Sequence, residues 1–276
     1  MTVTQFLRDT VPALLDGFAD VYRFNDVRLQ ARRIAGECNP MGVDNQKVAG
    51  PATHRSYPEN CPPSCAHLKG HHRTGNASCM SNKGNLRKHN NKATPGWYPA
   101  AVAATACIFH AQRTYPPRKA RLHVTGGLWL DGELDWQYID CLTGTRDLDG
   151  IVTQIKRRLR LPPDTKVAFG YAHVPHGDWR NRLMDHGIHF RLSAHADDGG
   201  VITWPFDHLK VLEQHLGRRI TRCPHNLRRW INCQRCRLCF LRDNNLIAFS
   251  PTLGAPRDTF DPPELARELG LIPKTT

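Results

Sequence analysis

The stretch KVAFGYAHVPHGDWRNRLMDHGIHFRLSAH, residues 166–195, decides the expected fold. Its two ends, residues 166–174 and 188–195, are short and mostly apolar, as is typical of buried β-strands. Between them, residues 179–187 predict a short helix that ends at Gly187. A strand, a helix and a second strand in succession predict two parallel strands joined by a crossover helix.

The same alternation extends in both directions along the chain. Helices are expected at residues 101–112, 149–160 and 206–217, and strands at residues 121–127, 201–204, 219–223 and 245–251. We therefore predict an α/β fold with a complete or partial (β/α) barrel, whose chemistry would lie at the carboxyl ends of the strands. About six strands are recognisable, fewer than the eight of a closed barrel.

Three segments are expected. Residues 1–36 form a leading helical segment, because apolar residues recur at helical spacing within residues 4–20. Residues 37–100 are rich in Gly, Pro, Asn, His and Lys without periodicity, but they contain cysteines, so we expect a metal-ordered loop region rather than a linker. Residues 101–276 form the barrel body, with a Cys-rich insertion at residues 223–239.

The amino-acid composition indicates which kinds of partner the protein would bind. The 276 residues carry 38 Lys+Arg against 25 Asp+Glu, a formal net charge of +13, which favours a polyanion: nucleic acid first, an anionic membrane surface second. No run of eighteen apolar residues is present, and the N-terminus lacks the basic and apolar regions of a signal peptide. We expect no membrane insertion and a cytoplasmic protein. In that reducing compartment, ten cysteines indicate metal or redox chemistry rather than disulfides.

The first thiol cluster is Cys61, Cys65 and Cys79, with the spacing C-x3-C-x13-C. Three thiolates with one position left open suit a four-iron cluster, or a zinc ion completed by a histidine. The alternative is a set of unrelated reduced thiols, but a polar, Pro-rich loop offers free cysteines no apolar pocket to fill.

The second cluster is Cys223, Cys233, Cys236 and Cys239, with the spacing C-x9-C-x2-C-x2-C. Four thiolates make a closed site, either structural zinc or a saturated four-iron cluster. The C-x2-C-x2-C run is more typical of ferredoxins than of zinc ribbons. Iron is therefore the preferred metal at this site and zinc the alternative.

Several of these motifs carry a family resemblance. In chain order they are NCPPSC (60–65), CMS (79–81), RLHVTGG (121–127), AFGYAH (168–173), FRLSA (190–194), and RCPHNLRRWINCQRCRLC (222–239) followed by NLIAFSPTLG (245–254). The series resembles a group of uncharacterised phage-encoded proteins that are similar to distant radical-SAM enzymes. The resemblance covers roughly residues 58–254. The chain departs from the family pattern at Met80 and Ser81, where the family has Tyr-Ala, and in its long spacer.

The resemblance implies a use for the glycines after the strand at residues 121–127. In radical-SAM enzymes a glycine-rich turn at this place offers backbone groups to the amino end of S-adenosylmethionine, so Thr125, Gly126 and Gly127 are candidate cofactor-binding residues. Leu128 stands where such turns commonly have an acid. A tight structural turn is the alternative role of the paired glycines.

Polar residues at the strand ends are candidates for catalysis. They are His123, Tyr171, His173 and His195, together with the acids of LDGELD, namely Asp131, Glu133 and Asp135. For each single histidine an ordinary structural role is the alternative. The acidic stretch could equally supply the nucleophile of a transglycosylase-like barrel, or form a turn that opens a helix at Leu134, since acids stabilise a first helical turn.

Arginines gather around the second thiol cluster. The predicted nucleic-acid contacts are Arg218, Arg219, Arg222, Arg228, Arg229, Trp230, Arg235 and Arg237. Arginine binds phosphate in bidentate geometry and tryptophan offers a stacking face for a base. Two classes of function follow: an iron–sulfur enzyme that modifies a base or nucleotide within nucleic acid, and a non-catalytic nucleic-acid-binding protein with structural metal sites.

Overall fold

The computed structural model describes part of the chain, in two compact units. The described residues are 1–35, 41–42, 50–55, 96–123, 127–172, 177–192, 201–203, 209–227, 231–240 and 246–249. The units are Met1–Phe190 and Arg191–Thr276, and each is treated by itself below. The predicted barrel body of residues 101–276 is therefore divided between them.

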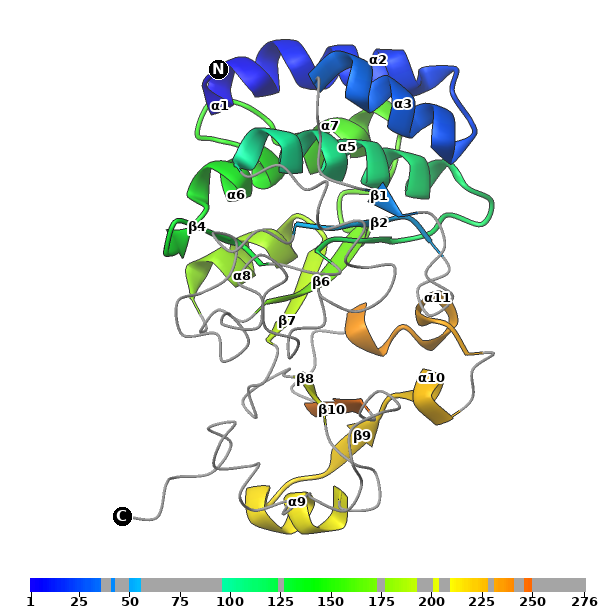
Figure 1. Ribbon diagram of the computed structural model, residues 1–276, viewed down its shortest axis with the longest axis vertical. Helices are drawn as coiled ribbons and strands as arrows, with labels where there is room; N and C mark the ends of the chain where they lie inside the picture. The colour runs from blue at the N-terminus through cyan, green and yellow to red at the C-terminus, as the bar shows by residue number, and fades with distance from the viewer. Residues whose placement is uncertain are drawn as a thin grey trace, which may run out of the picture. The chain divides into compact units, whose positions relative to one another are not determined.

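Helices form a large part of the described residues of the first unit. They are α1 (Val3–Gln5), the π-helical turn η1 (Phe6–Thr10), α2 (Val11–Ala19), α3 (Phe24–Ala35), α5 (Trp97–Arg113), α6 (Trp136–Thr143), α7 (Ile151–Arg158) and α8 (Asp178–Asp185). Helix α5 is apolar almost all round and nearly all of it is buried, as expected for a helix covered on several sides. It packs on α2 and α3 and also on the sheet, so it separates the N-terminal helices from the strands (Figure 1).

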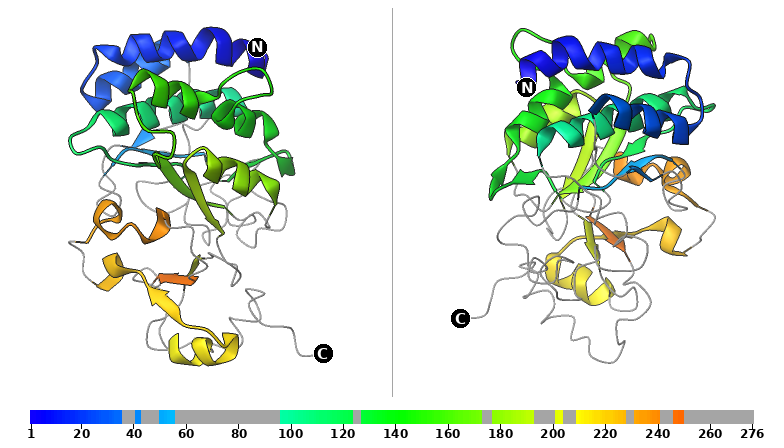
Figure 2. Two further views of the ribbon diagram at one scale, coloured as in Figure 1. Left: turned by 180° about the vertical axis from the view of Figure 1, so that it is seen from behind. Right: turned by 45° about the horizontal axis from the view of Figure 1, so that its top comes forward.

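A mixed sheet lies under α5. Its strands, in hydrogen-bonded order, are β1 (Met41–Gly42), β2 (Ala52–Thr53), β3 (Ala120–Arg121), β6 (Ala168–Ala172) and β7 (Ile188–Leu192). Strand β1 is antiparallel to β2, whereas β2, β3, β6 and β7 form the parallel part (Figures 1 and 2). The predicted strand–helix–strand unit is present as β6, α8 and β7, and Gly187 follows α8 with φ of 88°.

The α/β class is confirmed, but the described strands do not form a closed barrel. Closure would require the later strands to continue the ladder from β7. Instead β8 (Val201–Thr203), β9 (Ile220–Arg222) and β10 (Leu246–Phe249) pair with one another in a separate sheet, with β10 in the centre and parallel to both neighbours. The prediction of a complete barrel is not borne out.

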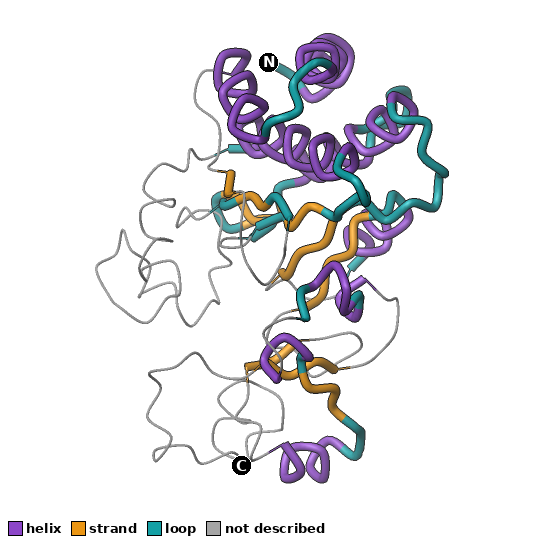
Figure 3. The backbone as a smooth tube through the Cα atoms, turned by 90° about the vertical axis from the view of Figure 1, so that its right-hand side faces the viewer, coloured by secondary structure: helices purple, strands orange, loops and turns teal. Residues whose placement is uncertain are grey.

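The second unit contains this small sheet and four short helical segments. They are α9 (Leu209–Leu216), α10 (Pro224–Leu227), α11 (Cys233–Cys236) and the 3₁₀ turn η6 (Leu238–Phe240). Helix α9 joins β8 to β9, so strand and helix alternate here as the sequence predicted (Figure 3). Across both units, none of the helices drawn from described residues combines the length and apolar character needed to cross a bilayer.

The acidic stretch LDGELD forms a hairpin followed by a helix. Strands β4 (Trp129–Leu130) and β5 (Glu133–Leu134) pair antiparallel across Asp131 and Gly132, both of which have positive φ. Asp-Gly is a favoured pair for such a two-residue turn. Helix α6 then begins at Trp136, with the Asp135 side chain accepting the Tyr138 N–H as its cap. The stretch is thus a turn and a helix start, two residues later than predicted.

Candidate functional site

The carboxyl ends of β2 and β3 bring two polar side chains together. Strand β2 leads to Arg55 and strand β3 leads to His123, and the two strands are parallel neighbours. Parallel neighbours end at the same edge of a sheet, so residues that follow them lie close together. The His123 N–H donates to Thr53 Oγ1 at 3.0 Å, which links the two strand ends directly.

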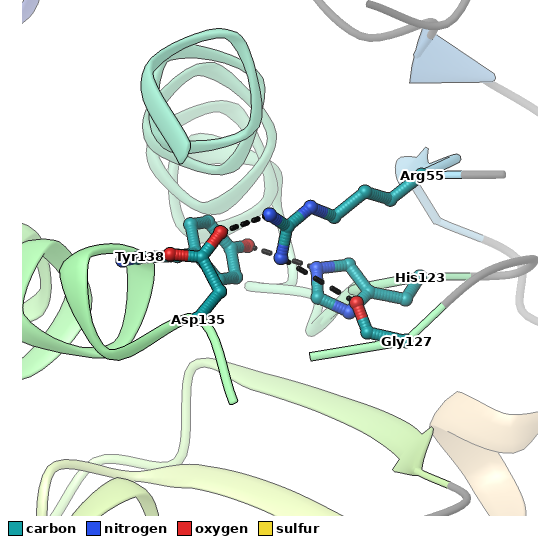
Figure 4. Close-up of polar contacts among 5 residues, drawn as sticks. All are labelled: Arg55, His123, Gly127, Asp135 and Tyr138. Carbon is teal, nitrogen blue, oxygen red and sulfur yellow. Dashed lines mark hydrogen bonds and ion pairs between the residues drawn. The ribbon is translucent and has the colours of Figure 1, made fainter. Parts of the chain in front are cut away.

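Arg55 is the centre of the site, and its guanidinium is paired (Figure 4). It forms an ion pair with the Asp135 carboxylate, and both side chains are 1% exposed. Its Nη1 also donates to the Gly127 carbonyl at 3.5 Å. The Asp135 N–H donates to Leu128 O at 2.8 Å, so the β4–β5 hairpin brings Gly127 and Asp135 to the same guanidinium. Arg55 therefore links Gly127 to Asp135 at the start of α6.

Tyr138 completes the network. The Arg55 guanidinium lies over its ring, 4.7 Å from the centroid, and its hydroxyl lies 3.0 Å from His123 Nε2. Burial raises the pKa of Tyr138, while Arg55 acts in the opposite direction and Asp135 reinforces the rise. The hydroxyl keeps its proton and can donate it to Nε2.

His123 is a neutral and strained histidine. Burial lowers its pKa well below the ordinary value, and the charge of Arg55 acts in the same direction. If Nε2 accepts from Tyr138, the proton of the neutral ring lies on Nδ1, which is buried and has no hydrogen-bond partner among the described residues. The backbone of His123 has φ of 53°, a conformation that costs a residue other than glycine of order 1 kcal/mol and that clusters at functional sites.

A second arginine lies on the opposite face of the same sheet. Ala52, Arg121 and Phe169 are paired in register across β2, β3 and β6, so their side chains share one face, which we call the Arg121 face. Tyr171 belongs to it as well, two residues after Phe169. The Arg121 guanidinium lies 5.0 Å from the centroid of the Tyr171 ring.

The other predicted catalytic residues do not converge on this site. Asp131 and Glu133 are exposed at the hairpin turn, and Asp135 is held by Arg55 and by the cap of α6. A nucleophile needs a carboxylate with a free oxygen near other reactive groups. The described geometry therefore does not favour the transglycosylase hypothesis. His173, His195, Thr125 and Gly126 lie outside the described residues.

The predicted metal ligands divide between the two parts of the chain. Cys61, Cys65 and Cys79 lie outside the described residues. In the second unit Cys223, Cys233 and Cys239 are buried and Cys236 is half-buried, and none is in a disulfide. Within the described segments no three His, Cys, Asp or Glu side chains are grouped as metal ligands. Metal binding at either cluster stays a prediction.

Helix α11 forms the backbone around two cysteines of the second cluster. Asn232 caps α11 by accepting the Arg235 N–H at 3.1 Å, and Arg237 ends the helix in the left-handed conformation with φ of 61°. Arg191, at the start of this unit, donates to Leu238 O at 2.8 Å, between the last two cysteines. A single helical turn thus carries Cys233 and Cys236 at its two ends.

The predicted nucleic-acid residues are only partly described. Arg219, Arg222, Arg235 and Arg237 are exposed, Arg218 is half-buried, and Arg228, Arg229 and Trp230 lie outside the described residues. Exposed guanidinium groups beside α11 are compatible with phosphate contacts, but the same exposure is ordinary for surface arginines.

Sequence reasoning missed Arg55 and Tyr138. Arg55 follows a two-residue strand in a region whose composition predicts a loop, and Tyr138 lies in a helix of which the sequence predicted only the start. The sequence offers one signal for Arg55. In the run ATHR, residues 52–55, a small apolar residue is followed by three polar residues, of which the arginine is the last. Comparison of the chain with protein-family models, with curated proteins and with solved structures found no match.

Proposed function

We propose that the chain is an iron–sulfur enzyme of radical-SAM type that modifies a base or nucleotide within nucleic acid, built on an open, partial (β/α) barrel. In this proposal Cys61, Cys65 and Cys79 hold the metal centre. The site lies at the carboxyl ends of the parallel strands, where such sheets bind their ligands.

One observation supports the proposal above all others, namely the chain order around β2 and β3. Strand β2 leads into the segment that contains the three cysteines, and Cys61 follows Arg55 by six residues. The chain returns through α5 to β3, which is parallel and adjacent to β2 and precedes Thr125, Gly126 and Gly127 in the sequence. The segment with the cysteines and the segment with the glycines therefore follow neighbouring parallel strands. The family resemblance implies this order.

The described residues fit a bound S-adenosylmethionine in one respect and differ in another. Arg55 donates to the Gly127 carbonyl, which would help to orient Gly127 toward a ligand's polar end. Leu128, which is fully buried, has no polar side-chain atom and cannot replace the acid that such turns commonly carry. When reduced by an iron–sulfur centre, S-adenosylmethionine supplies a carbon radical that abstracts hydrogen. His123 and Tyr138 would hold protons at the edge of such a site.

The test begins with protein purified without oxygen. We expect broad absorbance near 400 nm, stoichiometric iron, and reductive cleavage of S-adenosylmethionine to methionine and 5′-deoxyadenosine, with absorbance on the order expected for iron–sulfur proteins. Cys65→Ala should stay folded but lose the cleavage. The matched control is Cys107→Ala, which removes a buried thiol of α5 outside both clusters. A full iron complement without binding or cleavage of S-adenosylmethionine would contradict the radical chemistry.

A second candidate function is nucleic-acid binding without catalysis, with structural metal at Cys223, Cys233, Cys236 and Cys239. The observation that favours it is the placement of the cysteines on and around α11, beside exposed Arg235 and Arg237. Stoichiometric zinc without colour, and equal loss of folding in Cys236→Ala and Cys65→Ala, would support this candidate.

Both candidates require nucleic-acid binding, which can be measured separately. Arginine contacts to phosphate release counterions, so affinity should fall steeply with salt. Replacing Arg228, Arg229 and Arg235 with Ala should weaken binding and flatten the salt dependence. Unchanged affinity and slope in this triple variant would contradict the arginine interface.

A further inference from the structure

The Arg121 face combines a cation with an aromatic ring and has no acid of its own. The four parallel strands β2, β3, β6 and β7 contain Arg121 and Arg191 but no Asp or Glu. The described interaction of the Arg121 side chain is with Tyr171: the guanidinium carbon lies over the ring, 5.0 Å from its centroid. No described carboxylate pairs with it, and its Nε has no hydrogen-bond partner among the described residues.

The Arg121 side chain lacks a described hydrogen-bond acceptor, which is unfavourable for a partly buried cation. Arg121 is half-buried, and its buried Nε–H has lost contact with water without gaining a described acceptor. Two other half-buried arginines of the first unit do have acceptors: Arg113 donates to the Phe18, Ala19 and Val21 carbonyls, and Arg182 pairs with Asp140. The contact with the Tyr171 ring uses none of the N–H donors of the Arg121 guanidinium.

From this we infer that Arg121, stacked on Tyr171, binds an oxyanion carried by a small-molecule ligand, and specifically the phosphate of a nucleotide. The planar guanidinium of an arginine offers parallel N–H donors that match phosphate or carboxylate oxygens. The net charge of +13 favours the phosphate, because it concentrates polyvalent anions at the protein. Binding of this kind does not depend on the metal chemistry proposed above, since the residues involved belong to the sheet itself.

The position of Arg121 in the sheet supports a ligand site. It lies in β3, two residues before His123, near the carboxyl end of a parallel strand. Neighbouring Tyr171 lies near the carboxyl end of β6. Ligands of parallel α/β sheets bind at the carboxyl ends of the strands, so an anion at Arg121 would lie at the usual place for a ligand.

The experiment measures binding of adenosine 5′-monophosphate, adenosine and inorganic phosphate to the full chain by calorimetry. We expect the monophosphate to bind and adenosine to bind at least tenfold more weakly. Arg121→Met should weaken monophosphate binding at least tenfold, and Arg121→Lys should recover only part of it, because lysine lacks the planar fork. Tyr171→Phe should bind as the parent does and Tyr171→Leu more weakly, since only the latter removes the ring.

The matched control is Arg28→Met. Arg28 is also a half-buried arginine whose Nε has no described partner, but it lies on α3 rather than in the sheet. Folding is checked by the melting temperature, which should be nearly unchanged in Arg121→Met without ligand, because no ion pair is broken. At the same concentration the monophosphate should raise the melting temperature of the parent more than that of the variant.

Several outcomes would overturn the inference. Equal monophosphate binding by the parent and Arg121→Met would do so, as would equal binding of adenosine and its monophosphate. The absence of monophosphate binding at concentrations up to about 10 mM would do so too. Stronger competition by acetate than by phosphate would overturn the assignment of a phosphate as the ligand.

Discussion

Two arginines on adjacent strands of one sheet have opposite surroundings. Arg55, after β2, lies over the Tyr138 ring, and Arg121, in β3, lies over the Tyr171 ring. The first also has a buried carboxylate, Asp135, and a carbonyl acceptor, whereas the second has neither among the described residues. An arginine over a tyrosine ring thus occurs twice at the sheet. In the first pair, which we call closed, the guanidinium also has polar partners, whereas in the second, which we call open, it has none among the described residues. A closed network holds a fold together, while an open one is available to a ligand.

The largest expected effect comes from opening the closed network. Asp135→Asn removes the carboxylate but keeps a side chain that can cap α6, so it isolates the loss of charge. Arg55 would then be a buried, uncompensated charge. We expect the free energy of unfolding to fall by about 3–5 kcal/mol, measured by urea denaturation.

The double variant Arg55→Met/Asp135→Asn serves as its control. Removing both charges leaves no uncompensated ion, so part of the stability should return. A double variant less stable than Asp135→Asn alone would show that Arg55 contributes through packing on Tyr138 rather than through the ion pair.

A smaller effect is expected from the tight packing on the α5 side of the sheet. A Cβ at Gly170 would lie 2.4 Å from Phe190 Cε1 and 2.9 Å from Leu122 O. Phe190 also contacts the rings of His123 and Trp179, so it cannot move freely. Gly170→Ala should lower the free energy of unfolding by about 1–3 kcal/mol. Adding Phe190→Leu should recover part of that loss, and no recovery would point to the Leu122 carbonyl as the obstacle.

The sequence predicted this architecture unevenly. Residues 166–195 gave the correct strand–helix–strand unit, because both strands are apolar and the intervening helix ends at a glycine. Strands β2 and β3 have two residues each, and the sequence pattern predicts a loop at the first and places the second too far along the chain. Hydrophobic periodicity cannot identify a two-residue strand, because alternation needs several residues to become visible.

The candidate site was also predicted only in part. His123 and Asp135 stand out by their positions at a strand end and in an acidic run, but their roles depend on Arg55, which is 80 residues from Asp135 along the chain. A single sequence contains no signal for such a pairing. The strand pairing was equally hidden: β10 inserts between β8 and β9, and the order of strands in a sheet is set by tertiary contacts rather than by local pattern.

The pH dependence of stability should report on the closed network through His123. Burial holds its folded-state pKa well below the ordinary value of 6.5, with Arg55 adding to the shift. Above pH 6.5 both folded and unfolded states are neutral and the stability is complete. Below pH 6.5 the histidine is protonated in the unfolded state but stays neutral in the folded state. The free energy of unfolding therefore falls by up to about 1.4 kcal/mol per pH unit until the folded-state pKa is reached.

The variant for this measurement is His123→Asn, because asparagine tolerates the positive φ at this position. We expect a shallower slope between about pH 5 and 6.5 than in the parent. His110 has a pKa lowered by burial and by Arg113 and Arg118, so His110→Gln is measured in parallel to separate its share. An unchanged slope in His123→Asn would mean that the ring is protonated in the folded state.

The smallest effect is expected from the acids that precede Asp135 in sequence but lie outside its network. Asp131 and Glu133 are exposed at the β4–β5 turn and form no ion pair with a described residue. Asp131→Asn keeps a residue that accepts φ of 51° in an Asp-Gly-type turn, and Glu133→Gln keeps the size of the side chain. Each change should alter the free energy of unfolding by no more than about 0.5 kcal/mol and leave any nucleic-acid modification intact. Loss of activity in Glu133→Gln at unchanged stability would instead place an acid of the hairpin in the reaction, and the division between a structural Asp135 and two solvated neighbours would no longer hold.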